Sequence, residues 1–174
     1  MDMEKEIVNK VALSPLVSID LADYHDGAPR VGIDIAPQLF RGMLLKEADF
    51  RDWLGHHDWT QYSGQHVHLF CSVDAIIPGW TWMLLAIQLQ PFAKTIVFGS
   101  REELEKTIWQ KALDTIDYSA WEGKKIVVKG CGEIEIPQAA YVEFIVRLRA
   151  IAEKLMYGEP CSTVPLWKKE KAKA

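Results

Sequence analysis

The feature that most constrains this chain is an alternation of short apolar strands and amphipathic helices from residue 66 onward. Strands are expected at 66–73, 95–98 and 125–129, and helices at 79–90, from 101 to about 116, and after Pro137. This order favours parallel strands, because parallel neighbours need a long crossover such as a helix. We therefore expect an α/β fold: a single-domain sandwich with a mainly parallel or mixed sheet and helical crossovers.

Local signals mark where some of these helices begin and end. Ser100 and Glu103 have the spacing of a capping box, in which each side chain satisfies a free amide at a helix start. Pro137 suits a first helical turn. The stripe that includes Phe144, Leu148 and Leu155 predicts that the last helix continues to Gly158.

The rest of the chain is expected to complete one domain over residues 1–174. Residues 1–30 have the composition of a loose lead-in, although 16–21 has the pattern of a short strand or a helical turn. A strand is expected at 31–35 and a helix at 46–57. Residues 167–174 are expected to form a basic, solvated tail. The segment 79–90 is apolar on every side, which is typical of a helix buried between layers.

Charge and apolar content narrow the classes of function. The net charge is −4, and the only dense basic run is at 168–173, so a nucleic-acid partner is not expected. Residues 1–6 are charged and lead into no signal-peptide core. The most apolar stretch is about half the length that crosses a bilayer. Three cysteines without a secretory signal predict reduced thiols in the cytoplasm.

Each cysteine lies close to a glycine, to a proline or to the end of a predicted strand. Cys71 comes near the end of one predicted strand, and Cys131, between Gly130 and Gly132, just past another. Ligands of open parallel sheets bind beyond the carboxyl ends of the strands, so these thiols share an edge if their strands are adjacent. Gly99 and Ser100 end a third strand at a helix start, where free amides favour an anion.

Cys161 joins this edge only along one of two backbone paths. If the chain turns at 130–132 and residues 133–136 return antiparallel, the last helix brings Cys161 back beside Cys131. If the chain runs directly into the helix, Cys161 is carried to the opposite edge, because twenty helical residues span about 30 Å.

Converging thiolates would form a metal site. We expect Cys71, Cys131, Cys161 and Asp74 as ligands of zinc or iron, with Asp74 the weakest assignment. His66 and His68 rank lower, because alternation along a strand to residue 73 places them on the face opposite Cys71. The alternatives are three buried cysteines that act as small hydrophobes, a thiol-dependent enzyme with a cysteine nucleophile, and a non-catalytic homodimeric interaction module.

Several segments together resemble a known family. They are 8–11, 57–62, 71–78, 127–131 and 156–166, and they resemble the uncharacterised bacterial family domain of unknown function 2480 over nearly the whole chain. Its members are often encoded near iron–sulfur assembly genes, so the resemblance implies a thiol-bearing accessory protein with iron–sulfur assembly proteins as partners. The order of Cys71 with Asp74, Cys131 and Cys161 is also similar to iron–sulfur scaffold proteins, but the spacing departs from theirs, so this likeness is an analogy.

Overall fold

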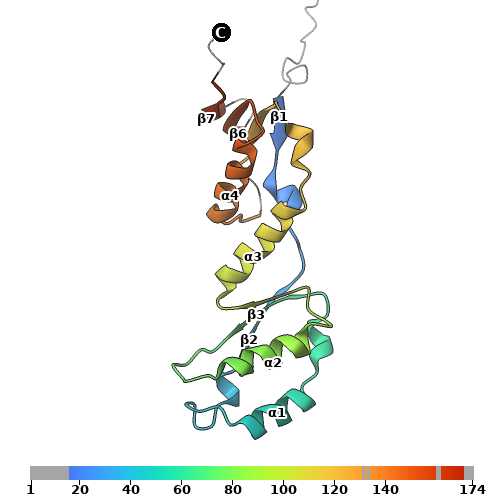
Figure 1. Ribbon diagram of the computed structural model, residues 1–174, viewed down its shortest axis with the longest axis vertical. Helices are drawn as coiled ribbons and strands as arrows, with labels where there is room; N and C mark the ends of the chain where they lie inside the picture. The colour runs from blue at the N-terminus through green and yellow to red at the C-terminus, as the bar shows by residue number, and fades with distance from the viewer. Residues whose placement is uncertain (1–15, 131, 133, 160–161, 171–174) are drawn as a thin grey trace, which may run out of the picture. The chain divides into compact units, whose positions relative to one another are not determined.

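The computed structural model describes residues 16–130, 132, 134–159 and 162–170 (Figure 1). It confirms the predicted α/β class, with α-helices between strands that pair mainly in parallel. The strands are divided between two sheets rather than gathered in one. The chain also divides into two compact units: unit 2 is Asp26–Lys111, and unit 1 combines the chain up to His25 with the chain from Ala112. The predicted single domain over 1–174 stays a prediction.

Unit 2 is built on a three-stranded parallel sheet in the order β2-β3-β4. Its strands are β2 (Arg30–Asp34), β3 (His66–Phe70) and β4 (Thr95–Phe98), and its helices are α1 (Glu47–His56), α2 (Gly79–Leu89) and most of α3 (Arg101–Asp114). Short 3-10 helices span Ala36–Gln38 and Trp59–Tyr62. The predicted elements of this region are therefore all present, although β3 ends at Phe70 rather than at residue 73.

One face of this sheet forms the core of unit 2. Val67 and Leu69 of β3 pack in one cluster with Phe50 of α1 and with Leu85 and Leu89 of α2, so both helices cover the same face (Figure 1). The period of two along β3 places His66, His68 and Phe70 on the opposite face.

The expected burial of α2 on all sides is not observed. Met83 and Ile87 are 67% and 64% exposed, while Leu85 and Leu89 are fully buried. The helix therefore covers the sheet with one face and presents an apolar second face, a distinction that a uniformly apolar sequence cannot specify.

Unit 1 contains a four-stranded mixed sheet in the order β1-β5-β6-β7. Its elements are β1 (Leu16–Ile19), β5 (Lys125–Val128), α4 (Gln138–Arg149), β6 (Lys154–Glu159) and β7 (Ser162–Lys168), with 3-10 helices at Leu21–Tyr24 and Tyr118–Trp121. β1, β5 and β6 are parallel, and β7 is antiparallel to β6. Part of the predicted lead-in is thus strand β1, and the first residues of the predicted basic tail belong to β7.

The prediction of a last helix that continues to Gly158 is wrong. α4 ends at Arg149, and residues 154–159 form β6 between β5 and β7. Leu155 is fully buried, as predicted, but in a strand, because a short apolar run fits a helical stripe and a buried strand equally well. Residues 154–159 form a strand because they pair with β5 on one side and with β7 on the other. Pro165 is tolerated in β7 because this strand lies at the sheet edge, beside a register shift at residues 155–156.

The backbone after β5 leads into α4, as in the second predicted path, but neither path includes the strand β6 that follows α4. Among the described residues of 133–136, none belongs to a strand, so the predicted antiparallel return is not observed. α4 instead serves as a crossover, and β6 returns the chain parallel to β5, with Val128 opposite Tyr157. Gly130 and Glu159, which follow these residues, therefore lie at the same edge of this sheet. No helix in the described part of the chain is long and apolar enough to span a bilayer.

Candidate functional site

A cavity of about 700 Å³ lies at the carboxyl edge of the unit 2 sheet, where β3 and β4 end. This is the position at which open parallel sheets bind ligands, because loops from successive strands meet there. Its polar lining includes His68, Cys71, Asp74, Ser100 and Arg101. Its apolar lining includes Val73, Ala75, Ile77, Trp82 and Phe98.

Cys71 is the first residue after β3 and is a partly buried free thiol. The loop that it begins is held from the neighbouring strand. Oδ1 of Asp34, the last residue of β2, accepts hydrogen bonds from the backbone N–H of Ser72 at 3.0 Å and of Ala36 at 2.9 Å. Burial raises the pKa of Asp34, but the hydrogen bonds from Ser72 and Ala36 outweigh burial and hold this pKa below its usual value. Asp34 is therefore a carboxylate that positions Cys71.

His68 lies in the same cavity, which the sequence did not predict. Its Nδ1 is 3.1 Å from the carbonyl oxygen of Gly99, and its ring stacks on Phe70 with a centroid distance of 5.1 Å. Because a carbonyl oxygen only accepts, Nδ1 carries the proton in the neutral ring and Nε2 keeps its lone pair. Nε2 is thus the ring nitrogen that can accept a proton, and it lies against Gly32 of β2.

His68 ranks below the other candidates because side chains that alternate along a strand through residue 71 would place it on the face opposite Cys71. That rule stops applying at Phe70, where β3 ends, and the loop beyond it brings Cys71 to the cavity. A sequence signal for His68 is Gly32 in the interior of β2. A Cβ at position 32 would lie 2.6 Å from Nε2 of His68, so only glycine leaves room for the ring.

The predicted capping box is present at the start of α3. The Ser100 N–H donates to Oε2 of Glu103 at 2.7 Å, and the Glu103 N–H donates to Oγ of Ser100 at 3.2 Å. The Glu103 carboxylate therefore already lies where an external anion would bind, and it takes one of the amides on which the predicted anion site depends.

The predicted metal ligands are only partly placed. Cys71 and Asp74 line the same cavity, whereas Cys131 and Cys161 lie outside the described residues. β5 belongs to a different sheet from β3 and β4, so the argument from adjacent strands does not hold. Within the described ranges, no group of three or more His, Cys, Asp or Glu side chains is arranged to hold a metal. The four-ligand site stays a prediction.

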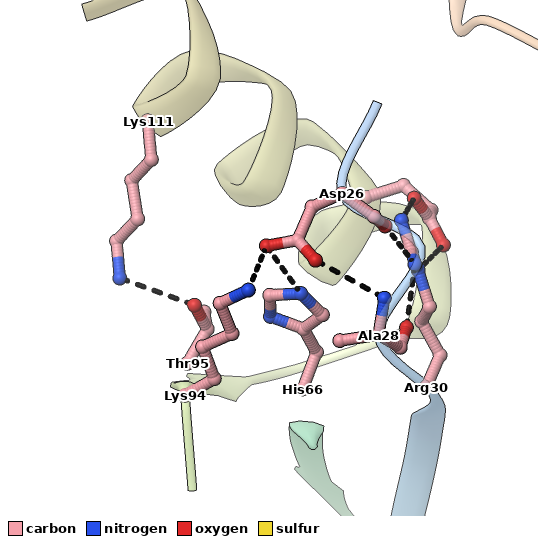
Figure 2. A network of polar contacts seen from close by, with 8 residues as sticks. Asp26, Ala28, Arg30, His66, Lys94, Thr95 and Lys111 are labelled. Carbon is pink, nitrogen blue, oxygen red and sulfur yellow. Dashed lines mark hydrogen bonds and ion pairs between the residues drawn. The ribbon is translucent and has the colours of Figure 1, made fainter. Parts of the chain in front are cut away.

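A polar network occupies the opposite, amino-terminal edge of the unit 2 sheet (Figure 2). Asp26 Oδ2 lies 2.6 Å from Nζ of Lys94 and 3.2 Å from Nε2 of His66, and the His66 contact does not have hydrogen-bond geometry. Arg30 Nε donates to Glu105 of α3 at 3.0 Å, and its Nη1 donates to the carbonyl of Asp26. The network ties the segment before β2 to the starts of β3 and β4 and to α3.

The network has the electrostatics of a structural anchor. The contact with Lys94 holds the pKa of Asp26 well below its usual value, despite partial burial. Burial lowers the pKa of His66, and the Asp26 carboxylate opposes this only in part. His66 is therefore neutral near pH 7 and buried, with a side-chain exposure of 3%. A ring that is enclosed in this way is more suited to packing than to proton transfer with a ligand.

The two edges together define an α/β protein with a candidate small-molecule pocket at the carboxyl edge of a parallel sheet and a polar anchor at the amino edge. The chain belongs to the family described as protein of unknown function (DUF2480), whose sequence profile matches residues 5–169. This confirms the resemblance found in the sequence. Searches of curated proteins and of solved structures gave no match.

Proposed function

We propose that this protein is a cytoplasmic thiol-bearing accessory protein that holds a small ligand against Cys71 in the cavity of unit 2. The observation that carries the proposal is that Cys71, His68 and Asp74 line one cavity at the carboxyl edge of the sheet. Within the described ranges Cys71 has no disulfide or hydrogen-bond partner, so its sulfur is available to a ligand. We propose His68 as the acceptor of the thiol proton through an intervening water or ligand group, because no direct hydrogen bond joins it to Cys71 within the described ranges, and Asp34 holds the loop.

The same residues support a thiol-dependent enzyme as an alternative, with Cys71 as nucleophile and His68 as base. A nucleophilic cysteine needs a base within reach, and His68 is the histidine that lines this cavity. The two proposals differ in turnover, since an accessory protein retains or passes on its ligand unchanged.

A metal-binding function with zinc or iron is a second candidate. What favours it is the pairing of β5 with β6, which places Gly130 and Glu159, near neighbours of Cys131 and Cys161 in sequence, at one sheet edge. Cys71, Asp74, Cys131 and Cys161 are the proposed ligands, and iron–sulfur assembly proteins are the partners that such a site suits. Metal content distinguishes it: stoichiometric metal in anaerobically purified, untagged protein must be lost in each of the three Cys→Ser variants.

A homodimer is the further partner that we propose, formed through the second face of α2. Met83 and Ile87 are exposed there, and the helix carries no charged residue. Its test is the mass in solution of wild type and Met83→Lys: a dimer that becomes a monomer supports the proposal, and a wild-type monomer at high concentration contradicts it.

The leading proposal is tested by the rate at which iodoacetamide alkylates Cys71 at pH 7, with each cysteine resolved by mass spectrometry. We expect Cys71 to react in the folded protein and His68→Gln to slow it several-fold, because the variant lacks the proton acceptor. His56→Gln is the matched control, since His56 is exposed on α1, outside the cavity lining, and interacts with Asp52 of the same helix. A rate that is unchanged in His68→Gln, or a Cys71 that reacts only on unfolding, contradicts the proposal.

A further inference from the structure

The cavity around Cys71 has an apolar wall and a polar rim. Trp82 of α2 and Phe98 of β4 contact each other with a ring centroid distance of 4.8 Å, and Ile77 extends their surface. Phe98 is 63% exposed although it is a large aromatic side chain at the end of a strand. Phe98 and the partly buried Trp82 form an aromatic pair in the lining of the cavity, which is suited to bind an apolar group of a ligand.

The polar rim carries one cation and one anion. Arg101 is the first residue of α3, and the acidic side chains nearest to it in the helix already have partners. Glu102 pairs with Lys106 at 3.0 Å, Glu103 caps the helix, and Glu105 binds Arg30. No ion pair of Arg101 is found in the described part of the chain, and the same holds for Asp74. The rim thus carries two opposite charges, on Arg101 and Asp74, whose formal sum is zero.

We infer that the ligand of this cavity is a small zwitterion of the α-amino-acid class with an apolar side chain. The inference rests on the proposed function of the cavity and names its ligand. The guanidinium of Arg101 has the geometry for a carboxylate, and the carboxylate of Asp74 suits an ammonium group. The apolar side chain lies on Trp82 and Phe98, which brings the ligand beside Cys71.

The charges also oppose other classes of ligand. A phosphate or another polyanion meets the carboxylate of Asp74 as well as Arg101, and the amides of Ser100 and Glu103 are already bonded. A neutral apolar compound leaves both Arg101 and Asp74 without a partner. A zwitterion satisfies both charges and the apolar wall at once.

Isothermal titration calorimetry with L-phenylalanine tests the inference, with N-acetyl-L-phenylalanine and L-phenylalanine amide as probes that each lack one charge. We expect the amino acid to bind about tenfold more tightly than either derivative, the ratio that one charged hydrogen bond supports. Arg101→Gln should weaken the amino acid but not the amide, and Asp74→Asn should weaken the amino acid but not the acetyl derivative. Arg51→Gln on α1, which pairs with Glu47, is the control.

The inference is overturned if the three compounds bind with equal affinity or if none binds at millimolar concentration. It is also overturned if Arg51→Gln weakens binding as much as Arg101→Gln or Asp74→Asn does. The variants change exposed side chains, and thermal unfolding verifies that they are folded. The alkylation rate of Cys71 is measured on the same samples. If His68→Gln still slows it while phenylalanine does not bind, the ligand class is wrong and the thiol function stands. If neither effect is found, both proposals fail.

Discussion

At the scale of single residues, the candidate site depends on one glycine, which leaves space for a histidine ring, and on one carboxylate, which holds the loop of Cys71. Gly32 leaves the space into which the His68 ring fits, and Asp34 binds the amide of Ser72 beside Cys71. Both belong to β2, which contributes no thiol or base of its own. The neighbouring strand therefore acts on the site by positioning, so mutations in β2 are expected to alter the chemistry of Cys71.

We predict that Gly32→Ala displaces His68. The new Cβ would lie 2.6 Å from Nε2 of His68 and 2.9 Å from the ring of Phe70, too close for either to stay in place. The expected loss in the free energy of unfolding is about 1–3 kcal/mol, measured by urea denaturation, together with slower alkylation of Cys71.

Gly27→Ala is the control for this prediction, because a Cβ at position 27 has no atom within 4 Å. It should leave both measurements near their wild-type values. If Gly32→Ala behaves like the control, the ring of His68 is not held in the position described.

At the scale of secondary-structure elements, the helix starts follow from local residues and the strand partners do not. The start of α3 is determined by Ser100 and Glu103, which are three residues apart and bond each other's amides. β6 has no comparable local signal, since its apolar residues also fit a helical stripe. Its backbone groups are satisfied by β5 and β7, which lie elsewhere in the chain.

We predict that Ser100→Ala lowers the free energy of unfolding by about 1 kcal/mol, the usual cost of losing a helix cap. The amide of Glu103 loses its acceptor, and the Glu103 side chain loses the geometry that keeps it over Gly99. Thermal or urea unfolding measures the loss. Glu102→Gln in the same turn removes only an exposed pair with Lys106 and should cost a few tenths of a kcal/mol. Equal effects of the two variants contradict the role of the cap.

At the scale of the whole molecule, each unit has its own sheet and its own polar interactions. In unit 2 the charges at the amino edge surround the buried His66, with Asp26, Lys94 and Arg30 as its charged neighbours. In unit 1, Arg147 of α4 binds Asp114 at 2.6 Å and also contacts Glu143, which raises the pKa of its guanidinium against the effect of burial. Only the first of these groups contains a side chain that titrates near neutral pH.

We predict that unit 2 is destabilised by acid in two steps. The pKa of His66 is lower in the folded chain, so its contribution is complete above about pH 6.5 and is lost as the pH falls below that value. The pKa of Asp26 is also lower in the folded chain, so its contribution is present above about pH 4 and is lost as the pH falls further. Hydrogen exchange of the β3 amides between pH 7 and pH 3, corrected for intrinsic rates, measures both steps.

His66→Gln should flatten the first step, because the variant no longer binds a proton there. Asp26→Asn should reduce the second step, and the remainder is expected from Asp34, whose pKa is also lowered in the folded chain. His56→Gln, which changes an exposed histidine of α1, should keep the wild-type profile. A first step that persists in His66→Gln places its origin outside the network.

Local sequence patterns were enough to predict the α/β class, most of the strands and helices of unit 2, the cap of α3 and the position of Cys71 at the end of a strand. These depend on residues within a few positions of one another, through periodicity, capping and turn chemistry. Three features required the folded structure: the division of the strands between two sheets, the strand at residues 154–159, and the cavity that His68 and Cys71 share. Such choices depend on pairing and packing between distant segments, which short apolar runs do not specify.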